Sequence, residues 1–299
     1  MARRSRQSLN TLWLGLAAPG MAWMALFFIV PFYSVAAVAF GQVDPIRQSA
    51  VPEWNPRYWD FTLFTDVMHR VVNGDLGTVF IRTALYVVLA VAGCVVVGYP
   101  VAYFVSREAG KWRAALLVLM ILPYWVSYLM RMLAWVNLLQ PQGWMAQLLS
   151  HLPAGNRNWL SGQPITVVFG LVYGYVPFFI LPLYATLDRI DGRLLEAARD
   201  LGATSRQAFW RVTLPLSRQG LMAACVITAL PMVGDYYTNN LLSASPRTEM
   251  VGNQIVFFLQ QTTQPQVGAS LVLMLSAALL VVMAGYLVSV NRAQKLVTR

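Results

Sequence analysis

Six long apolar runs set the strongest constraint on what this 299-residue chain can fold into. A helix rises about 1.5 Å per residue and the hydrocarbon core of a bilayer is about 30 Å thick, so about 20 apolar residues make one span. The sequence therefore predicts an all-α integral membrane protein with six transmembrane helices. The runs cover approximately Leu12–Phe40, Val79–Val105, Ala114–Leu139, Ile165–Leu187, Leu221–Leu242 and Ala269–Val290.

The composition excludes the common soluble classes. Hydrophobic residues make up 58% of the chain and charged residues 11%, whereas soluble chains are about 45–50% apolar and about 25% charged. An ordinary cytosolic enzyme, a disordered protein and a disulfide-stapled secreted domain are all excluded. Cys94 and Cys225 lie in separate apolar runs, so we expect packing residues rather than a disulfide or a metal site. The first run is too long for the apolar part of a signal peptide, which predicts an uncleaved anchor.

The positive charge follows the predicted topology, because cytoplasmic loops of membrane proteins are enriched in Lys and Arg. With the N-terminus inside, fifteen of the twenty-two basic residues are cytoplasmic, six lie outside and Arg131 lies within the third run. The net charge of +10 then resides on the inner side, both termini are cytoplasmic, and nucleic acid is not needed as a partner. The residues assigned inside are Arg3, Arg4, Arg6, Arg107, Lys111, Arg113, Arg189, Arg193, Arg199, Arg206, Arg211, Arg218, Arg292, Lys295 and Arg299, and those assigned outside are Arg47, Arg57, Arg70, Arg82, Arg157 and Arg247.

Prolines interrupt most of the runs. A proline inside a helix removes one backbone hydrogen bond and kinks the helix, and in lipid the freed carbonyl needs a protein or water partner. The pattern favours helices that face a bundle interior or a cavity, as in a transporter. The prolines within or near the ends of the runs are Pro31, Pro100, Pro123, Pro177, Pro182 and Pro231.

The loop at 188–219, between the fourth and fifth runs, begins with a predicted amphipathic helix. Asp191 is a suitable N-cap, and apolar residues recur three and four positions apart along one face. Gly202 suits the left-handed residue that ends such a helix. The apolar residues of this face are Leu194, Ala198 and Leu201.

A second short helix is predicted after the turn. Thr204 followed three residues later by Gln207 is a capping-box pattern, and Pro215 is expected to end this helix. The loop is then a helix–turn–helix at the inner membrane surface. From the residues alone, it either docks on another protein or packs under the helix bundle.

The same loop resembles the EAA loop of ABC importer permeases. That pattern reads Glu-Ala-Ala, three residues, Gly, nine residues, then Ile-x-Leu-Pro, and this chain departs from it only in Val212 for the isoleucine. The loop also lies between the fourth and fifth of six spans, as in that family. The residues for which the resemblance implies a coupling role are Glu196, Ala197, Ala198, Gly202, Leu214 and Pro215.

The resemblance extends over nearly the whole chain and is closest to the permeases of spermidine/putrescine importers. It implies a single permease domain over residues 1–299 with the type I ABC importer fold and a cytoplasmic coupling loop at 188–219. Relatives that transport other small solutes show a similar degree of resemblance. The sequence therefore identifies the family better than the solute. The similar segments are Gly98–Tyr103, Leu122–Trp135, Gly174–Thr186 and Gly234–Leu242.

The resemblance also implies partners. A second permease subunit, expected to form a heterodimer with this one, would share two cytoplasmic ABC ATPase subunits and an extracytoplasmic solute-binding protein. The coupling loop would fit a groove on an ATPase, where the small side chains of Ala197 and Ala198 allow close approach. This chain has no Gly-rich phosphate loop, so ATP and Mg²⁺ are expected on the ATPases and no cofactor on this non-catalytic subunit. The expected location is the bacterial cytoplasmic (inner) membrane, in contact with lipid.

Asp235 and Arg131 are the two candidates for ionisable residues within the membrane, since Arg82 at the start of the second run is assigned outside. Such a group costs about 2.5–3.5 kcal/mol on insertion scales, so it faces a cavity or a partner. Asp235 with Tyr236 and Tyr237 offers a carboxylate and aromatic faces, which suit a polyammonium solute. The alternative is an Asp235–Arg131 ion pair that holds the third and fifth spans together. Further aromatic residues expected along the solute pathway are Tyr124, Trp125, Tyr128, Trp135 and Tyr175.

Two other functions stay open. One is a permease for a different small solute, such as an opine, an amino-acid-like compound or a phosphonate. The other is a secondary transporter driven by an ion gradient, which would need several intramembrane titratable groups and an inverted repeat. His69 and His151 lie in outer loops without carboxylates at ligand spacing, so we expect neither a metal site nor a catalytic site.

Overall fold

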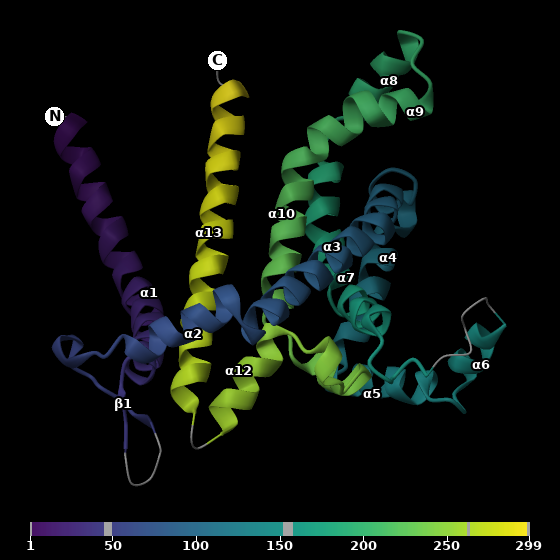
Figure 1. Ribbon diagram of the computed structural model, residues 1–299. Coiled ribbons are helices and arrows are strands. Elements are labelled where there is room, and N and C mark those ends of the chain that lie inside the picture. The colour runs from purple at the N-terminus through teal and green to yellow at the C-terminus, as the bar shows by residue number, and fades with distance from the viewer. Residues whose placement is uncertain (1, 45–49, 152–157, 262–263, 298–299) are drawn as a thin grey trace. The chain divides into compact units, whose positions relative to one another are not determined.

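The computed structural model describes residues 2–44, 50–151, 158–261 and 264–297, with side chains between residues 15 and 290 apart from residue 43 (Figure 1). Arg47, Arg157 and Arg299 lie outside the described residues, as do the side chains of Arg3, Arg4, Arg6, Arg292 and Lys295. The predicted charge asymmetry and the cytoplasmic termini therefore stay predictions.

The described chain is almost entirely helical, as predicted. The α-helices are α1 (Ala2–Ala39), α2 (Thr62–Asn73), α3 (Asp75–Arg107), α4 (Arg113–Ile121), α5 (Tyr128–Leu139), α6 (Trp144–Ser150), α7 (Pro164–Asp188), α8 (Gly192–Asp200), α9 (Ser205–Ala208), α10 (Leu214–Val233), α11 (Tyr237–Leu242), α12 (Val251–Gln260) and α13 (Pro265–Val297). Short 3-10 helices cover Pro56–Tyr58 (η1), Gly110–Trp112 (η2), Leu122–Trp125 (η3) and Pro246–Thr248 (η5), and a π-helix covers Phe209–Thr213 (η4). The strands β1 (Gln42–Val43) and β2 (Ala50–Val51) form an antiparallel pair.

Five of the described helices are long and apolar enough to cross a membrane, and a sixth span results if one sharply bent pair counts as a single span. These agree with the predicted runs in place and order. The candidate spans are Gly15–Ala39, Asp75–Arg107, Pro164–Asp188, Ser205–Val233 and Pro265–Val290, with Gly110–Trp125 plus Tyr128–Leu139 as the bent pair.

The third predicted run is not one continuous helix, and that part of the prediction was wrong. Its two halves meet at an angle of 87°. Pro123 lies in the 3-10 turn before the break, and Val126 and Ser127 take extended backbone conformations with ψ of 136° and 140°. A proline cannot donate to the preceding turn, so the helix stops here and starts again at Tyr128.

The fifth predicted run also ends earlier than expected. Helix α10 stops at Val233, and a break separates it from the short helix α11. Asp235 therefore lies between two helices instead of inside a span. Its carboxylate accepts a hydrogen bond from the backbone N–H of Thr238 at 3.0 Å, and such local side-chain bonds compete with helix continuation.

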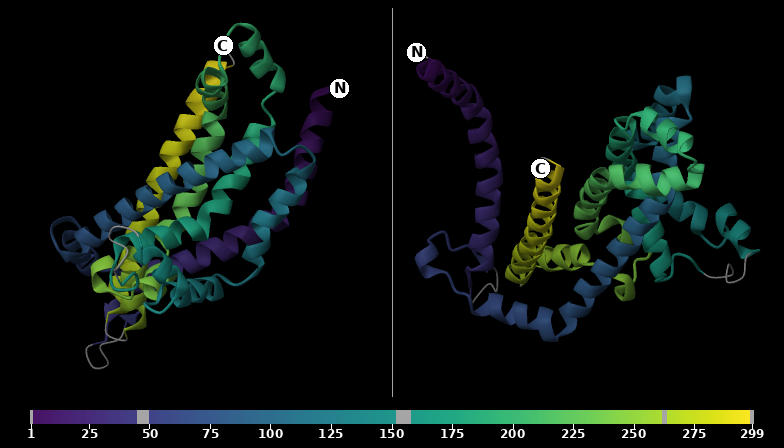
Figure 2. Two further views of the ribbon diagram at one scale, coloured as in Figure 1. Left: turned by 90° about the vertical axis from the view of Figure 1, so that its right-hand side faces the viewer. Right: turned by 90° about the horizontal axis from the view of Figure 1, so that it is seen from above.

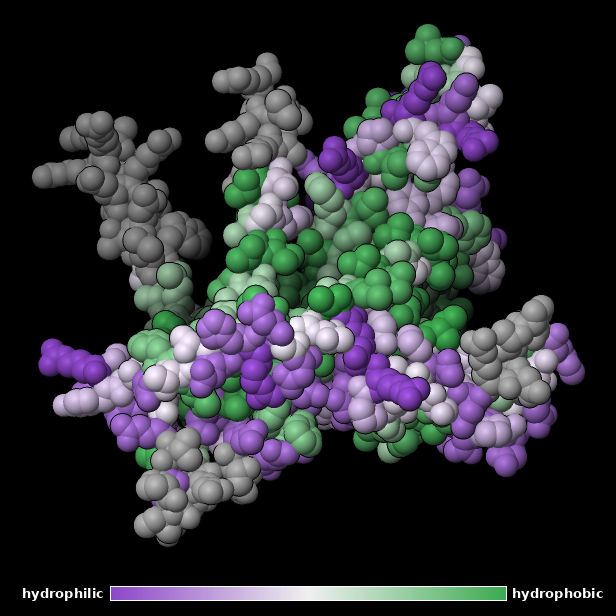
Figure 3. Space-filling model, in the orientation of Figure 1, coloured by the Kyte–Doolittle hydropathy of each residue, from purple (hydrophilic) through white to green (hydrophobic). Residues whose placement is uncertain are grey.

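The described residues fall into two compact units, and the larger covers Val71–Gln254 with Ala277–Arg299. Within it α3, α7 and α10 pack side by side (Figures 1 and 2). Gly98 lies against the ring of Phe179 and Gly220 against the side chain of Thr186, so closely that an added Cβ would lie 2.6 and 2.1 Å from them. Hydrophobic side chains cover the middle of α3 and α10, whereas mostly hydrophilic ones cover α8 and α9 (Figure 3).

The smaller unit covers Met1–Arg70 with Ile255–Ser276. Its centre is aromatic: the Phe40 ring lies 4.7–5.4 Å from the rings of Trp59, Phe61 and Phe64. The Asp60 carboxylate accepts a hydrogen bond of 2.9 Å from the backbone N–H of Thr62 at the start of α2. This bond, with that from the Thr62 hydroxyl, lowers the pKa of Asp60 below its ordinary value.

Candidate functional site

The loop between α7 and α10 begins as the sequence predicts. Asp191 accepts a hydrogen bond from the backbone N–H of Arg193 at 3.0 Å and so caps the start of α8. Gly202 ends this helix with a φ of +85°, in the left-handed region where only glycine is free of strain. Thr204 and Gln207 form a complete capping box at the start of α9. The loop lies beyond the ends of α7 and α10 (Figure 1).

The second half of the loop differs from the prediction. Pro215 does not end a helix; it lies in the first turn of α10, directly after a π-helical turn. The short helix α9 instead passes through the π-helical turn at Phe209–Thr213 into α10. The helix that contains both, Ser205–Val233, is one of those long and apolar enough to cross a membrane.

The predicted apolar face of α8 points to solvent. Leu201 is 90% exposed and Leu194 is also exposed, whereas Leu195 is buried and packs inward. Glu196 and Ala197 are exposed beside them. Leu194 and Leu201 therefore do not pack under the described helices, and docking on another protein stays a prediction.

Asp235 is the centre of a buried polar cluster at the α10–α11 break. Its side chain is 7% exposed. One carboxylate oxygen accepts from the Thr238 N–H at 3.0 Å, and the other lies 2.6 Å from the Thr238 hydroxyl, 3.1 Å from the Tyr175 hydroxyl and 3.2 Å from the Tyr128 hydroxyl. Three of these four contacts thus converge on one carboxylate oxygen and one reaches the other. The cluster therefore ties α5, α7 and α11 together.

Arg131 does not pair with Asp235, so the predicted ion pair between the third and fifth spans is wrong. No basic side chain of the described residues forms an ion pair with Asp235. The Arg131 guanidinium carbon instead lies 4.0 Å above the ring of Tyr124, 5.5 Å from that of Tyr128 and 5.9 Å from that of Tyr173. Such cation–π contacts stabilise a desolvated guanidinium. Its Nε and Nη1 atoms are buried without a hydrogen-bond partner among the described residues.

Tyr128 joins the two charged residues. Its hydroxyl contacts Asp235 and hydrogen-bonds to Thr238, while its ring lies near Arg131. The ring fits because position 174 is glycine: an added Cβ there would lie 2.8 Å from the Tyr128 side chain. Tyrosines, not a direct contact, thus connect the acidic and the basic side chain.

The remaining aromatic residues predicted to line the solute pathway differ in how exposed their side chains are. Tyr124 donates a hydrogen bond to the backbone carbonyl of Tyr173 at 2.5 Å. Trp125 is 83% exposed, and the rings of Tyr236 and Tyr237 are stacked with centroids 4.1 Å apart. Trp125 and Tyr237 are exposed, whereas Tyr236, like the other predicted aromatic residues, is half-buried.

Thr238 is the member of the cluster that sequence reasoning missed. An Asp followed three residues later by Thr, after a Gly, is the spacing of a helix start, and it was visible in the sequence. That signal predicts a break at Asp235. Among the described residues no group of three or more His, Cys, Asp or Glu side chains is placed to hold a metal ion.

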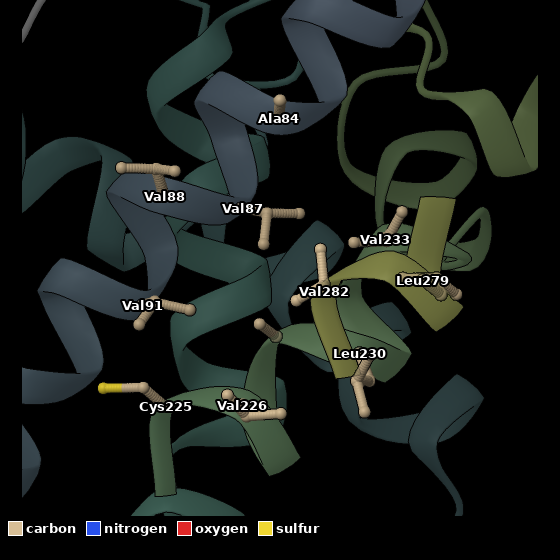
Figure 4. Close-up of a pocket in the computed structure, with 11 residues that line it drawn as sticks. Ala84, Val87, Val88, Val91, Cys225, Val226, Leu230, Val233, Leu279 and Val282 are labelled. Carbon is tan, nitrogen blue, oxygen red and sulfur yellow. The ribbon is translucent and has the colours of Figure 1, made fainter. Parts of the chain in front are cut away.

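An apolar pocket of about 380 Å³ lies between α3, α10 and α13 (Figure 4). Its lining side chains, including Val87, Val91, Leu230 and Leu279, are all hydrophobic. Without a polar group such a pocket cannot replace the hydration of a charged solute. It is therefore not a second candidate for the solute pathway.

Comparisons with known proteins place these features in a family. Residues 94–298 match the family described as "Binding-protein-dependent transport system inner membrane component". The spermidine/putrescine transport system permease protein PotB of Haemophilus influenzae is 35% identical over 93% of this chain and 92% of its own length. The protein of the same name from Escherichia coli is 30% identical over 93% of this chain and 96% of its own length.

The fold itself is known from a solved structure. A chain of the bacterial alginate ABC transporter, in complex with an alginate pentasaccharide-bound periplasmic protein, superposes with a TM-score of 0.72. The match covers 94% of each chain at 17% identity, so it shows the fold alone.

Proposed function

Because the chain belongs to the family of binding-protein-dependent transport system inner membrane components, we propose that it is the permease subunit of an ATP-driven importer of spermidine and putrescine. The observation that carries this proposal is the identity to the spermidine/putrescine permeases, which extends over almost the whole chain. The chain is then a transport subunit and not an enzyme. Both solutes are flexible polyammonium cations, so the pathway has to stabilise several positive charges.

The proposal includes an assembly and an orientation. The chain crosses the bacterial inner membrane six times, with the bent α4–α5 pair as the third span and both termini in the cytoplasm. A second permease subunit, as a heterodimer partner, completes the pathway. Two ATPase subunits bind ATP and Mg²⁺ on the cytoplasmic side, and an extracytoplasmic binding protein delivers the solute.

The loop around α8 and α9 is the proposed docking element for an ATPase. Exposed Leu201 supports this role, because a leucine side chain left in water costs about 1.5–3 kcal/mol relative to a buried one. None of the described residues has an atom in contact with a Cβ added at Gly202, within 4 Å, so a partner has room to approach. The residues assigned to this surface or to its link with α10 are Glu196, Ala197, Ala198, Gly202, Leu214 and Pro215.

The proposed solute pathway passes the α10–α11 break. Asp235 contributes a negative charge without a basic partner among the described residues, which attracts a polyammonium cation. The carboxylate is already held by hydrogen bonds from its own chain, so we assign direct contact with the solute to the aromatic faces nearby, which bind cations through their π-electrons. The residues assigned to the pathway are Asp235, Tyr236, Tyr237, Arg131, Tyr124, Trp125 and Tyr175.

Reconstitution of the complete complex in lipid tests this function. The permease is co-purified with its companion permease, the ATPase and the binding protein, and ATP hydrolysis is measured against binding protein loaded with a panel of solutes. We expect stimulation by spermidine- or putrescine-loaded protein only. Stimulation by an opine, an amino-acid-like compound or a phosphonate would keep the importer and reject the polyamine, and failure to associate with any ATPase would favour an ion-driven carrier.

A further inference from the structure

Two arginines at the cytoplasmic turn between α3 and α4 hold the start of the α8–α9 loop. Arg107 donates from Nη2 to the carbonyl oxygens of Leu187 at 3.0 Å and Ile190 at 2.8 Å. Arg113 forms an ion pair of 2.7 Å with Asp188, the last residue of α7. These contacts are called the arginine clamp below.

The clamp fits the chemistry of a helix C-terminus. The last carbonyl groups of α7 have no partner within the helix and carry the negative end of its dipole. A guanidinium supplies both a positive charge and hydrogen-bond donors, and charge-assisted bonds of this kind are about twice as strong as neutral ones. Arg113 also donates to the carbonyl oxygen of Ser106 at 2.7 Å, so the α3–α4 turn is itself braced.

The clamp acts at a very short connection. Only residues 189–191 separate α7 from α8, and Asp191 already caps α8. The carbonyl of Ile190 therefore lies one residue before that cap. Fixing this carbonyl and the Asp188 carboxylate leaves α8 little freedom to turn relative to the ends of α3 and α7.

The returning limb of the loop rests on the same helix. The ring of Phe209 meets the rings of Tyr99 and Tyr103 edge-on, with centroids 5.6 Å apart in each case. The Tyr99 hydroxyl also hydrogen-bonds to the buried Ser217 hydroxyl of α10 at 2.8 Å. The cytoplasmic end of α3 thus contacts both the outgoing and the returning limb.

We propose that Arg107 and Arg113 are positioning residues for energy coupling: they lock the base of α8 to α3 and α7, so that a displacement of the loop by its partner moves these helices. The inference rests on the proposed importer function, because it needs an ATPase that displaces the loop. Without the clamp, α8 would swing at residues 189–191 and the displacement would be lost before it reached the membrane.

Uptake per ATP hydrolysed in the reconstituted complex tests the clamp. We expect Arg107→Gln to lower this ratio about tenfold, the equivalent of one charge-assisted hydrogen bond. Arg107→Lys keeps a cationic donor and should retain more of the ratio. Lys111→Gln is the matched control, because Lys111 is exposed in the same turn and forms no hydrogen bond or ion pair with the described residues.

The ion pair is tested by exchange of its charges. Arg113 and Asp188 are each 38% exposed, so breaking the pair with Arg113→Asp should lower the ratio by less than Arg107→Gln, about two- to fivefold. Adding Asp188→Arg to that variant should restore it. A merely structural role would lower the amount of assembled complex, with uptake and hydrolysis falling together at a constant ratio.

The outcomes distinguish a failure of the proposed function from a failure of the clamp inference. If the wild-type complex shows no ATP-driven uptake, the proposed function fails. If the wild-type complex imports normally and Arg107→Gln behaves like Lys111→Gln, the clamp inference is overturned and the proposed function stands. A constant uptake ratio with less assembled complex also overturns the clamp.

Discussion

The α8–α9 loop and the Asp235 cluster satisfy their polar and apolar groups in opposite ways. The loop caps its backbone completely but leaves Leu201 in water. The cluster buries a carboxylate but supplies it with four donors from its own chain. The apolar side chains of the loop are buried only when another surface covers them, whereas the carboxylate of the cluster is hydrogen-bonded within its own chain.

This difference separates residues that bind from residues that hold the structure together. A loop with a family motif and a carboxylate in an apolar run are both attractive functional candidates from sequence. The first has an accessible surface that no other described residue covers at Leu201, and the second is held by hydrogen bonds from Tyr128 and Tyr175. Substitutions in the loop should therefore affect partner binding, and those in the cluster should affect stability.

The largest effect is expected from Gly202→Asp. This change puts a charge on the docking surface, and an unpaired buried charge costs about 3–5 kcal/mol, so uptake should fall more than a hundredfold while the amount in the membrane is unchanged. Gly202→Asn is the matched control, since it has the same shape and also tolerates left-handed backbone but carries no charge. Glu196→Arg should abolish uptake in the same way. Normal uptake by the Gly202→Asp complex would contradict the docking role.

Leu201→Asn should weaken binding of the ATPase without loss of stability. Burial of a leucine is worth about 1.5–3 kcal/mol, so the affinity should fall about ten- to a hundredfold, while the thermal unfolding midpoint stays unchanged because this side chain is exposed. Leu195→Asn on the same helix is the opposite case, because Leu195 is buried and its loss should lower the midpoint. Equal effects of the two changes on unfolding would remove the distinction between the faces of α8.

Asp235→Asn should lower the stability of the purified permease by about 1.5–3 kcal/mol, because the amide removes the charge that four donors stabilise. Thermal unfolding in detergent measures this, and in the folded fraction the loss of the charge should also weaken, but not abolish, the stimulation of ATP hydrolysis by polyamine-loaded binding protein. If the unfolding midpoint is unchanged and polyamine stimulation alone is lost, the carboxylate contacts solute directly and the structural role is wrong.

Tyr175→Phe should give the smallest effect, about 0.5–1.5 kcal/mol of stability, because it removes one of the four donors to Asp235. Tyr184→Phe on the same helix is its control, since the Tyr184 hydroxyl has no hydrogen bond within the described part of the chain. Indistinguishable unfolding of the two variants would mean that the Tyr175 hydroxyl contributes nothing to the cluster.

Local patterns were sufficient to predict the capping residues of the loop and the turn between its two helices. Asp191, Gly202 and the Thr204–Gln207 pair act through backbone groups within a few residues, so their spacing determines the outcome. The buried residue of α8 is Leu195, which lies outside the predicted apolar face, because which face of α8 turns inward depends on the helices that it meets.

Long-range contacts could not be predicted in the same way. The partners of Asp235 include Tyr128 and Tyr175, which are 107 and 60 residues away. The length of the apolar runs also did not reveal the helix breaks at Pro123 and Asp235. The first helix ends where Pro123 lacks an N–H, and the second ends where a side-chain hydrogen bond to Asp235 competes with the helix. Hydropathy measures whether a segment suits the membrane, not whether it crosses it as one helix.

Association with the ATPase in lipid nanodiscs is the most direct test of the distinction between loop and cluster. The amount of ATPase bound is compared for the wild-type permease, Gly202→Asp and Asp235→Asn, each normalised to folded protein. We predict full binding by the wild type and by Asp235→Asn, and none by Gly202→Asp. Undiminished binding by Gly202→Asp, or no binding by the wild type, would contradict the account.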